Sequence, residues 1–145
     1  MVVVVAAVAV VGSLYYFGTI NRSSILSRVH TTNIVNGLIT VQAGSWNSYE
    51  FSIPATATNA YLAGTFYASG GAGNDITVYV MTQTDFINWK NGHASNTYYN
   101  SGELTTSSFT TNLPAGDTYD LVYSNTNAIF SSKNVQTSAN LFYTL

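Results

Sequence analysis

Hydrophobic and polar positions divide the chain of 145 residues into three parts. Residues 1–18, MVVVVAAVAVVGSLYYFG, are apolar and contain no charge, and residues 19–36 mix apolar with polar positions. From Leu38 onward, short apolar runs alternate with polar residues and are bounded by Gly, Asn and Pro, which is typical of strands. The pattern predicts an α+β protein: a long N-terminal hydrophobic α-helix, then an antiparallel β-sandwich or jelly roll of about eight strands. We expect two regions, residues 1–36 and 37–145.

The first part of the chain is predicted to be a helix that packs against copies of itself. Residues 2–17 would span about 24 Å as a helix, close to the hydrocarbon core of a membrane. Small side chains within it allow close helix contacts, and its aromatic end resembles an interfacial belt. The predicted assembly residues are Val2, Val3, Val4, Val5, Ala6, Val8, Val10, Val11, Leu14, Tyr15, Tyr16 and Phe17.

The spacing of apolar residues, with Ile25, Leu26 and Val29 on one side, extends this helix to about residue 35, where Asn36-Gly37 would end it. Two alternatives stay open. The head could be a lone lipid anchor followed by a linker, or its valines could form a strand donated to a sheet.

Alternation and turn signals place eight strands in the remainder of the chain. The sequence TQTDFINWKNG, residues 82–92, interrupts them and predicts one helical turn that Thr84 caps and that buries Phe86 and Trp89. Turns are expected at Gly70–Gly73, as a hairpin, and at Leu113–Asp117. The predicted strands are 38–43, 46–53, 60–69, 74–81, 96–101, 103–112, 118–125 and 133–144.

The chain contains few charged residues, and this limits the partners that it can have. Charged residues are 7% of the chain and give a net charge of −2, with no basic cluster, so we expect no nucleic-acid partner. Cysteine is absent, which excludes disulfides and thiolate sites. A surface of hydroxyl and amide groups, whose solubility does not depend on ionised carboxylates, favours an extracellular location.

Residues capable of chemistry are few and scattered. The two histidines are His30 and His93, and a Ser-His-Asp set of His93 with Asp85 or Asp117 is available by chance among many serines. We therefore expect no enzyme, cofactor or metal site. Five acids, Asp75, Asp85, Glu103, Asp117 and Asp120, are spread singly and follow no calcium-loop spacing.

Tyrosine is abundant, with 11 residues, and several of them lie in predicted strands. Such residues could form a sugar-binding face or a subunit contact, although tyrosine also simply suits strands. The residues in question are Tyr98, Tyr99, Tyr119, Tyr123 and Tyr143.

The charges near the apolar head point to a family. Arg22 and Arg28 follow the head, which would hold the domain in the cytoplasm unless a basic leader had been removed before Met1. This organisation of residues 1–36 resembles an archaeal type IV pilin, with Val5 in place of the glutamate of bacterial pilins. The resemblance implies membrane insertion before assembly, then a helical homopolymer with helices in its core. Asn21-Arg22-Ser23 matches a glycosylation acceptor.

The second half of the chain also shows a resemblance. The segments GGAGNDITVYV (70–80), DFINWKNG (85–92), YYNSGELT (98–105), LPAGDTYDLVYSNTN (113–127) and SSKNV (131–135) resemble small GOLD-type β-sandwich domains. These imply a binding or assembly module without catalytic residues.

The sequence therefore predicts a structural subunit of an extracellular filament that contacts its own copies and attaches to glycans or to host or abiotic surfaces. The alternative is a single-span membrane protein that presents a GOLD-like sandwich as a binding or accessory domain.

Overall fold

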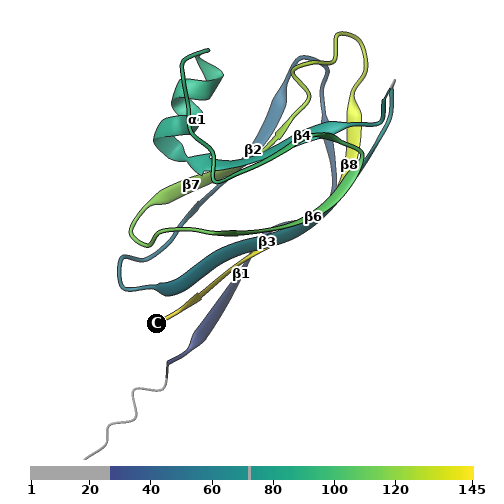
Figure 1. The fold of residues 1–145 in the computed structure, drawn as a ribbon. Coiled ribbons are helices and arrows are strands. Elements are labelled where there is room, and N and C mark those ends of the chain that lie inside the picture. The colour runs from purple at the N-terminus through teal and green to yellow at the C-terminus, as the bar shows by residue number, and fades with distance from the viewer. Residues whose placement is uncertain (1–26, 72) are drawn as a thin grey trace, which may run out of the picture.

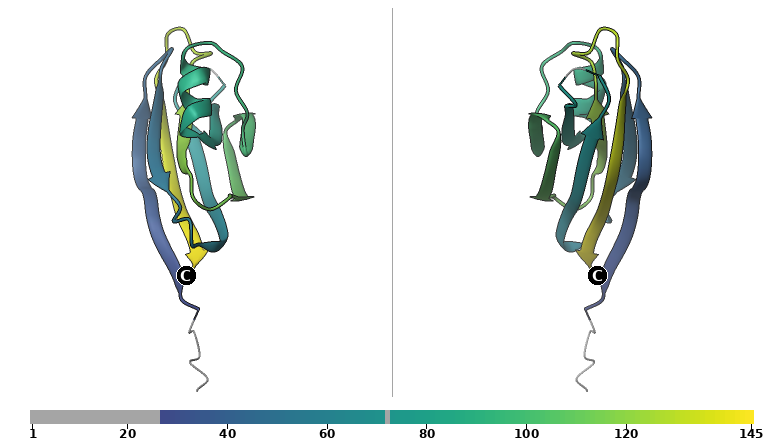
Figure 2. Two further views of the ribbon diagram at one scale, coloured as in Figure 1. Left: turned by 90° about the vertical axis from the view of Figure 1, so that its left-hand side faces the viewer. Right: turned by 90° about the vertical axis from the view of Figure 1, so that its right-hand side faces the viewer.

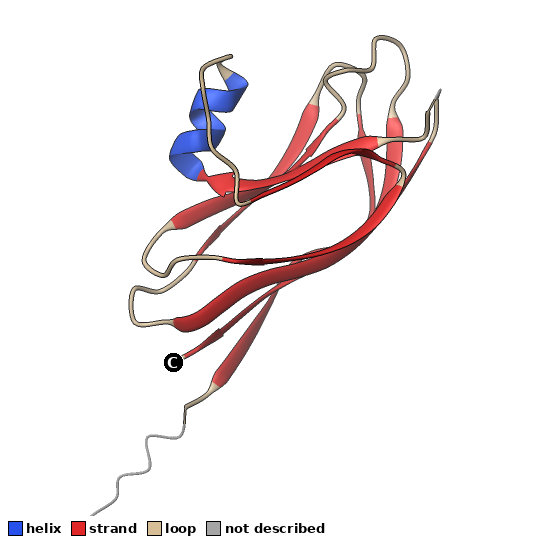
Figure 3. Ribbon diagram, viewed as in Figure 1, coloured by secondary structure: helices blue, strands red, loops and turns tan. Residues whose placement is uncertain are grey.

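The described chain is built almost entirely of β-strands. The computed structural model describes residues 27–71 and 73–145, and these form eight strands and one short helix (Figures 1 and 3). In chain order the elements are β1 (Val29–Val41), β2 (Trp46–Ser52), β3 (Thr58–Ser69), β4 (Ile76–Thr82), α1 (Gln83–Lys90), β5 (Tyr99–Leu104), β6 (Thr106–Asn112), β7 (Thr118–Ser124) and β8 (Lys133–Thr144).

The strands form two antiparallel sheets of four, in the orders β1-β8-β3-β6 and β2-β7-β4-β5. β1 pairs with β8, β2 with β7, β3 with β6, and β4 with β5, as in one long hairpin folded over into two layers. The pairs β3–β8 and β4–β7 complete the two sheets. This winding is that of a jelly roll. Figure 2 shows the two layers facing each other.

Alternating residues of each strand fill the space between the sheets. In β4, Ile76, Val78 and Val80 are buried in this core, as the alternation of the sequence predicts. Leu62 and Phe66 of β3 meet them from the other sheet, as members of the same cluster. β-branched and aromatic residues fit these half-buried positions well, which explains the strand-rich fold.

α1 covers the outer face of the β2-β7-β4-β5 sheet (Figure 1). Its Phe86 packs against Met81 and Val122, and the rings of Trp46 and Trp89 meet edge to face at 5.5 Å. Because the core covers one face of β7 and the helix covers the other, every residue from Tyr119 to Ser124 is buried.

The sandwich has two distinct ends. Arg28 and Leu145 exchange two backbone hydrogen bonds of 3.0 Å, so the start of the described chain and the C-terminus lie side by side (Figures 1 and 2). We call the opposite end, with the β1–β2 turn (residues 42–45) and the β7–β8 loop (residues 125–132), the loop end.

The predicted α+β class with a long N-terminal helix is wrong. Val29–Val41 is a strand paired along its length with β8, so no helix reaches residue 35. Gly37, expected to end the helix, lies inside this strand with a φ of 140°. The reason is tertiary: the inward side chains of Val35 and Val41 are buried in the core, and β8 satisfies the backbone of β1. β1 also spans residues 36 and 37, where the boundary between the two predicted regions was expected.

The expectation of a pilin with a transmembrane helix conflicts with the described part of the chain, residues 27–71 and 73–145. No helix there is long and apolar enough to cross a membrane. The predicted assembly residues, from Val2 to Phe17, and the acceptor Asn21 lie outside the described residues.

Two local predictions are also wrong. The helix is capped by Thr82 rather than Thr84, and it runs for eight residues. The segment Gly70–Gly73 was predicted as a hairpin, yet it connects β3 to β4, which lie in different sheets.

Candidate functional site

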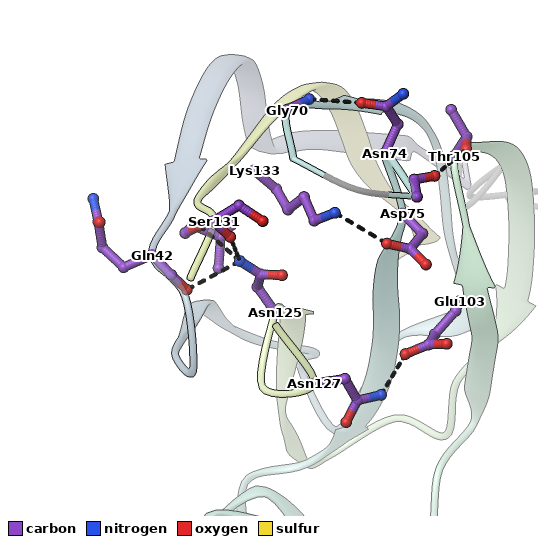
Figure 4. Close-up of polar contacts among 12 residues, drawn as sticks. Gln42, Gly70, Asn74, Asp75, Glu103, Thr105, Asn125, Asn127, Ser131 and Lys133 are labelled. Atoms are coloured by element: carbon purple, nitrogen blue, oxygen red, sulfur yellow. Dashed lines mark hydrogen bonds and ion pairs between the residues drawn. The ribbon is translucent and has the colours of Figure 1, made fainter. Parts of the chain in front are cut away.

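A pocket of about 430 Å³ opens at the loop end. It lies between the β7–β8 loop and the facing ends of β4 and β5. Figure 4 shows several of its polar side chains, among them Asp75, Glu103 and Lys133. Its lining combines two acidic residues, one lysine, several amides and hydroxyls, and an apolar rim. The lining residues are Asp75, Ile76, Thr77, Glu103, Ser124, Asn125, Asn127, Ala128, Ile129, Phe130, Ser131 and Lys133.

An ion pair lies in the wall of this pocket. Lys133 begins β8 and is 1% exposed, and its Nζ lies 3.1 Å from Oδ1 of Asp75 (Figure 4). The side chain of Asp75 is 36% exposed, so its carboxylate is bonded to a buried lysine and is still accessible to solvent. A buried ammonium is tolerated when it is paired in this way.

The amide of Asn125 holds the β7–β8 loop in place. Its Nδ2 donates toward the carbonyl oxygens of Val41, Gln42 and Ser131, at 3.2, 3.2 and 2.9 Å. Ser132 Oγ adds a hydrogen bond of 2.8 Å to Oε1 of Gln42. These bonds join the β7–β8 loop to the β1–β2 turn and to the end of β1, and they anchor both ends of the loop.

Two large apolar side chains project from this anchored loop. Ile129 is 80% exposed and Phe130 is 95% exposed, and both line the pocket. On the pocket's polar side, Asn127 Nδ2 donates to Oε1 of Glu103 (Figure 4). The arrangement places an apolar rim beside two carboxylates that are each held by one partner.

A second feature is the outer face of the β1-β8-β3-β6 sheet, which carries no charged side chain. We call it the neutral face. Strand register and alternation assign its residues: Val29, Thr31, Asn33, Asn36, Leu38 and Thr40 of β1; Asn134, Gln136, Ser138, Asn140, Phe142 and Thr144 of β8; Tyr61, Ala63, Thr65, Tyr67 and Ser69 of β3; and Thr106, Ser108, Thr110 and Asn112 of β6.

A carboxyl group is buried under α1, on the outer face of the other sheet. Asp120 is 3% exposed, and its Oδ2 has no hydrogen-bond partner among the described residues. Burial raises the pKa of Asp120, Glu50 on β2 raises it further, and Lys90 on α1 lowers it. Because the carboxyl is buried under the helix, it is not accessible to a substrate.

The structure separates the tyrosines that were candidates for a shared face. Tyr119 and Tyr123 are fully buried in the core, and burial is the main cause that raises the pKa of each to about 12. Tyr99 and Tyr143 pack against the same core, and Tyr98 is 42% exposed. A sugar-binding face made of these five residues is therefore wrong, because the alternation of their strands turns most of them inward.

His30 and the carboxylates considered for catalysis take part in local structure, whereas the side chain of His93 is exposed. His30 stacks on Tyr143 with ring centroids 5.2 Å apart. Asp85 accepts hydrogen bonds from Thr82 Oγ1 and from the backbone N–H of Asn96, and Asp117 accepts from the N–H of Thr118. Within residues 27–71 and 73–145, no three His, Asp or Glu side chains group to hold a metal ion.

Sequence reasoning overlooked most of the pocket. Asp75 and Glu103 were noted only as scattered acids, and Asn125, Phe130 and Lys133 were not singled out. The signal was present in the run NAIFSS, residues 127–132, where two large apolar residues interrupt a polar loop. The Asp75–Lys133 pair had no such signal, since 58 positions separate its members.

No protein-family model matches the chain, and the search of curated proteins finds no match either.

Proposed function

We propose that this protein is a structural subunit of an extracellular assembly, built from copies of the chain that contact one another through the neutral face and its free edge at β1. The observation behind the proposal is the absence of charge across all four strands of this face. Exposed surfaces without charge are common at protein contacts, because no ion has to be desolvated when they are covered.

The edge of the sheet supports the same proposal. β1 pairs only with β8, so the backbone groups along its other side have no strand partner among the described residues. Soluble proteins usually protect such an edge with lysine or proline, and the 13 residues of β1 contain neither. A register shift between Asn33 and Val35 is the one irregularity along this pairing. The Asn47 amide donates to the carbonyl oxygen of Thr40 at 3.2 Å near the end of β1, and the remaining length of the edge can pair with a second copy of the chain.

The neutral face also offers exposed apolar groups and a hollow. Leu38 is 67% exposed and Tyr67 is 56% exposed, while Tyr61 stacks on Phe142 at 4.9 Å. A shallow hollow of about 310 Å³ lies beside Phe142, around Ala63. These groups would supply the buried apolar area that holds neighbouring copies together.

The experiment compares a lysine placed on the neutral face with the same residue placed elsewhere. Full-length wild type, Leu38→Lys and Ser48→Lys are transferred from detergent into buffer and followed by sedimentation and negative-stain microscopy. Ser48 lies outward on β2, in the other sheet, opposite Val122. We expect wild type and Ser48→Lys to assemble, and Leu38→Lys to need about tenfold more protein, since an uncompensated buried charge opposes the contact.

Two results would contradict the proposal. One is a wild-type chain that stays monomeric at every concentration tested. The other is equal assembly of both lysine variants, which would place the contact away from the neutral face.

A further inference from the structure

The loop-end pocket has no part in the proposed assembly, because it lies at one end of the sandwich and the neutral face lies along its side. Its volume of about 430 Å³ falls within the range of small-molecule pockets, about 300–1,000 Å³. The pocket is also built from elements far apart in the sequence, and the Asn125 hydrogen bonds fix one wall of it. Such pre-organisation lowers the entropy cost of holding a ligand.

The charged residues that line the pocket determine which kinds of ligand fit it. Asp75 and Glu103 contribute two negative charges and Lys133 one positive charge, which leaves a net charge of −1 among the lining residues. An anionic ligand is disfavoured by the two carboxylates. A bare metal ion is disfavoured by the ammonium of Lys133 at 3.1 Å from Asp75, and no group of three ligating side chains is found in the described residues.

The polar groups suit a ligand that carries several hydroxyls. Each carboxylate has one oxygen engaged, Asp75 Oδ1 by Lys133 and Glu103 Oε1 by Asn127, and an ionised carboxylate accepts more than one hydrogen bond. Asp75 directly precedes β4, and Glu103 of β5 is opposite Thr77 of β4, so the two carboxylates lie at the paired ends of neighbouring strands. Two oriented acceptors that line one pocket match a ligand with more than one hydroxyl.

The apolar rim suits the other surface of the same ligand. Phe130 is 95% exposed on an anchored loop, and it borders the pocket together with Ile129. A pyranose ring has hydroxyls around its edge and a face of C–H groups, which packs on an aromatic ring as other apolar groups do. Phe130 and the two carboxylates thus present complementary surfaces to one sugar unit.

We propose that the loop-end pocket binds a neutral sugar unit, with its hydroxyls donating to Asp75 and Glu103 and its C–H face packed on Phe130. Lys133 and Asn127 are positioning residues that orient the two carboxylates. The site is separate from the neutral face, so an assembled subunit would still display it.

The test is saturation-transfer NMR with the full-length protein in a phosphocholine detergent, which contains no sugar. The probes are the methyl glycosides of glucose, galactose, mannose and N-acetylglucosamine, each titrated alone. We expect at least one to receive saturation, strongest on the C–H groups of one ring face. Glu103→Gln and Phe130→Ala should each weaken its binding about tenfold, as loss of a charged hydrogen bond or a ring contact does.

Matched variants control for the substitutions themselves. Glu50→Gln makes the same change on β2, and Tyr67→Ala removes an exposed ring from the neutral face; both should bind the glycoside like wild type. Saturation of none of the four glycosides would overturn the proposal. So would equal binding by Glu103→Gln and Glu50→Gln, or a preference for the ammonium of N-acetyl-lysine methyl ester over every glycoside.

Failure of sugar binding leaves the proposed assembly intact, because the two tests use different surfaces and different variants. Phe130→Ala and Glu103→Gln are expected to sediment like wild type.

Discussion

The phenol of Tyr123 on β7 is hydrogen-bonded to Thr137 on β8, and the two oxygens lie 2.6 Å apart across the core. Thr137 Oγ1 also donates to the carbonyl oxygen of Thr65, at 2.9 Å. Since a threonine hydroxyl has a single proton, Tyr123 is the donor to Thr137. This chain of hydroxyls joins the two sheets and satisfies two buried polar side chains.

Removing the Tyr123 hydroxyl should therefore cost less than removing that of Thr137. Tyr123→Phe leaves Thr137 bonded to Thr65, and we expect a loss of about 1 kcal/mol in the free energy of unfolding. Thr137→Val removes the acceptor of the buried phenol and leaves that phenol without its partner, and should cost about 2–3 kcal/mol. Urea unfolding of the two variants measures the difference, and a larger loss for Tyr123→Phe would contradict the direction of the bond.

The cap of α1 gives a second prediction with an internal control. Thr82 Oγ1 accepts from the N–H of Asp85 at 3.0 Å and donates to its carboxylate at 2.7 Å. Thr82→Ala should lower the free energy of unfolding by about 1 kcal/mol. Thr84→Ala, at an exposed position two residues further along, should be neutral or slightly stabilising, because alanine favours the helix. Equal losses for both variants would count against Thr82 as the cap.

Gly64 on β3 is required by its neighbours rather than by its backbone angles. A Cβ there would lie 2.7 Å from the carbonyl oxygen of Ser138 and 2.8 Å from Cζ of Phe109. Gly64→Ala should therefore destabilise the fold by about 1–3 kcal/mol, since the strand or the ring must shift. Ala63→Ser, which adds one atom on the outward side of the same strand, should be close to neutral. Thermal unfolding of both variants tests this, and an unchanged Gly64→Ala protein would refute the close packing.

The buried carboxyl of Asp120 predicts a dependence of stability on pH. Its pKa is raised above the ordinary 3.8, with burial the main cause, so the folded protein holds this proton more tightly than the unfolded chain. Its contribution to stability is full below the unfolded pKa and is lost as the pH rises through the folded value. Glu50 on β2, Lys90 on α1 and Met81 on β4 are the groups that face it.

Asp120→Asn removes this titration. Unfolding in urea from about pH 4 to about pH 7 should show a smaller fall in stability for the variant than for wild type. Asp117→Asn, at an exposed position in the β6–β7 loop, serves as the control and should follow wild type. Parallel curves for wild type and Asp120→Asn would mean that folding does not raise the pKa of Asp120.

Much of the β-structure is readable from the sequence because strand signals are local. The alternation of Ile76, Val78 and Val80 marks β4, and the short run TYDLVYS marks β7. The turn at Leu113–Asp117 follows from Pro114 and from Gly116, whose φ is 85°. Each of these signals depends on side chains within a few residues of one another.

The candidate site could not be read in the same way, because its members meet only after the sheets pair. Asp75 and Lys133 are brought together by the pairing of β3, β4 and β8 within the two sheets. No spacing of residues along the chain predicts this contact. The neutral face likewise depends on which side of each strand turns outward. Of the residues that line the pocket, Ile129 and Phe130 are the ones that the sequence alone marks as unusual, because they are large apolar residues in a polar loop.

Sequence by itself determined that residues 37–145 are rich in strands, poor in charge and without cysteine, since composition and period-two alternation are properties of the chain. Tertiary structure decided the jelly-roll pairing and the conformation of residues 29–36. The apolar spacing predicted a helix there, whereas pairing with β8 makes these residues part of an edge strand. Hydrogen bonds between strands join residues more than 100 positions apart, as between Val29 and Thr144, so they outweigh a local preference that no tertiary contact supports.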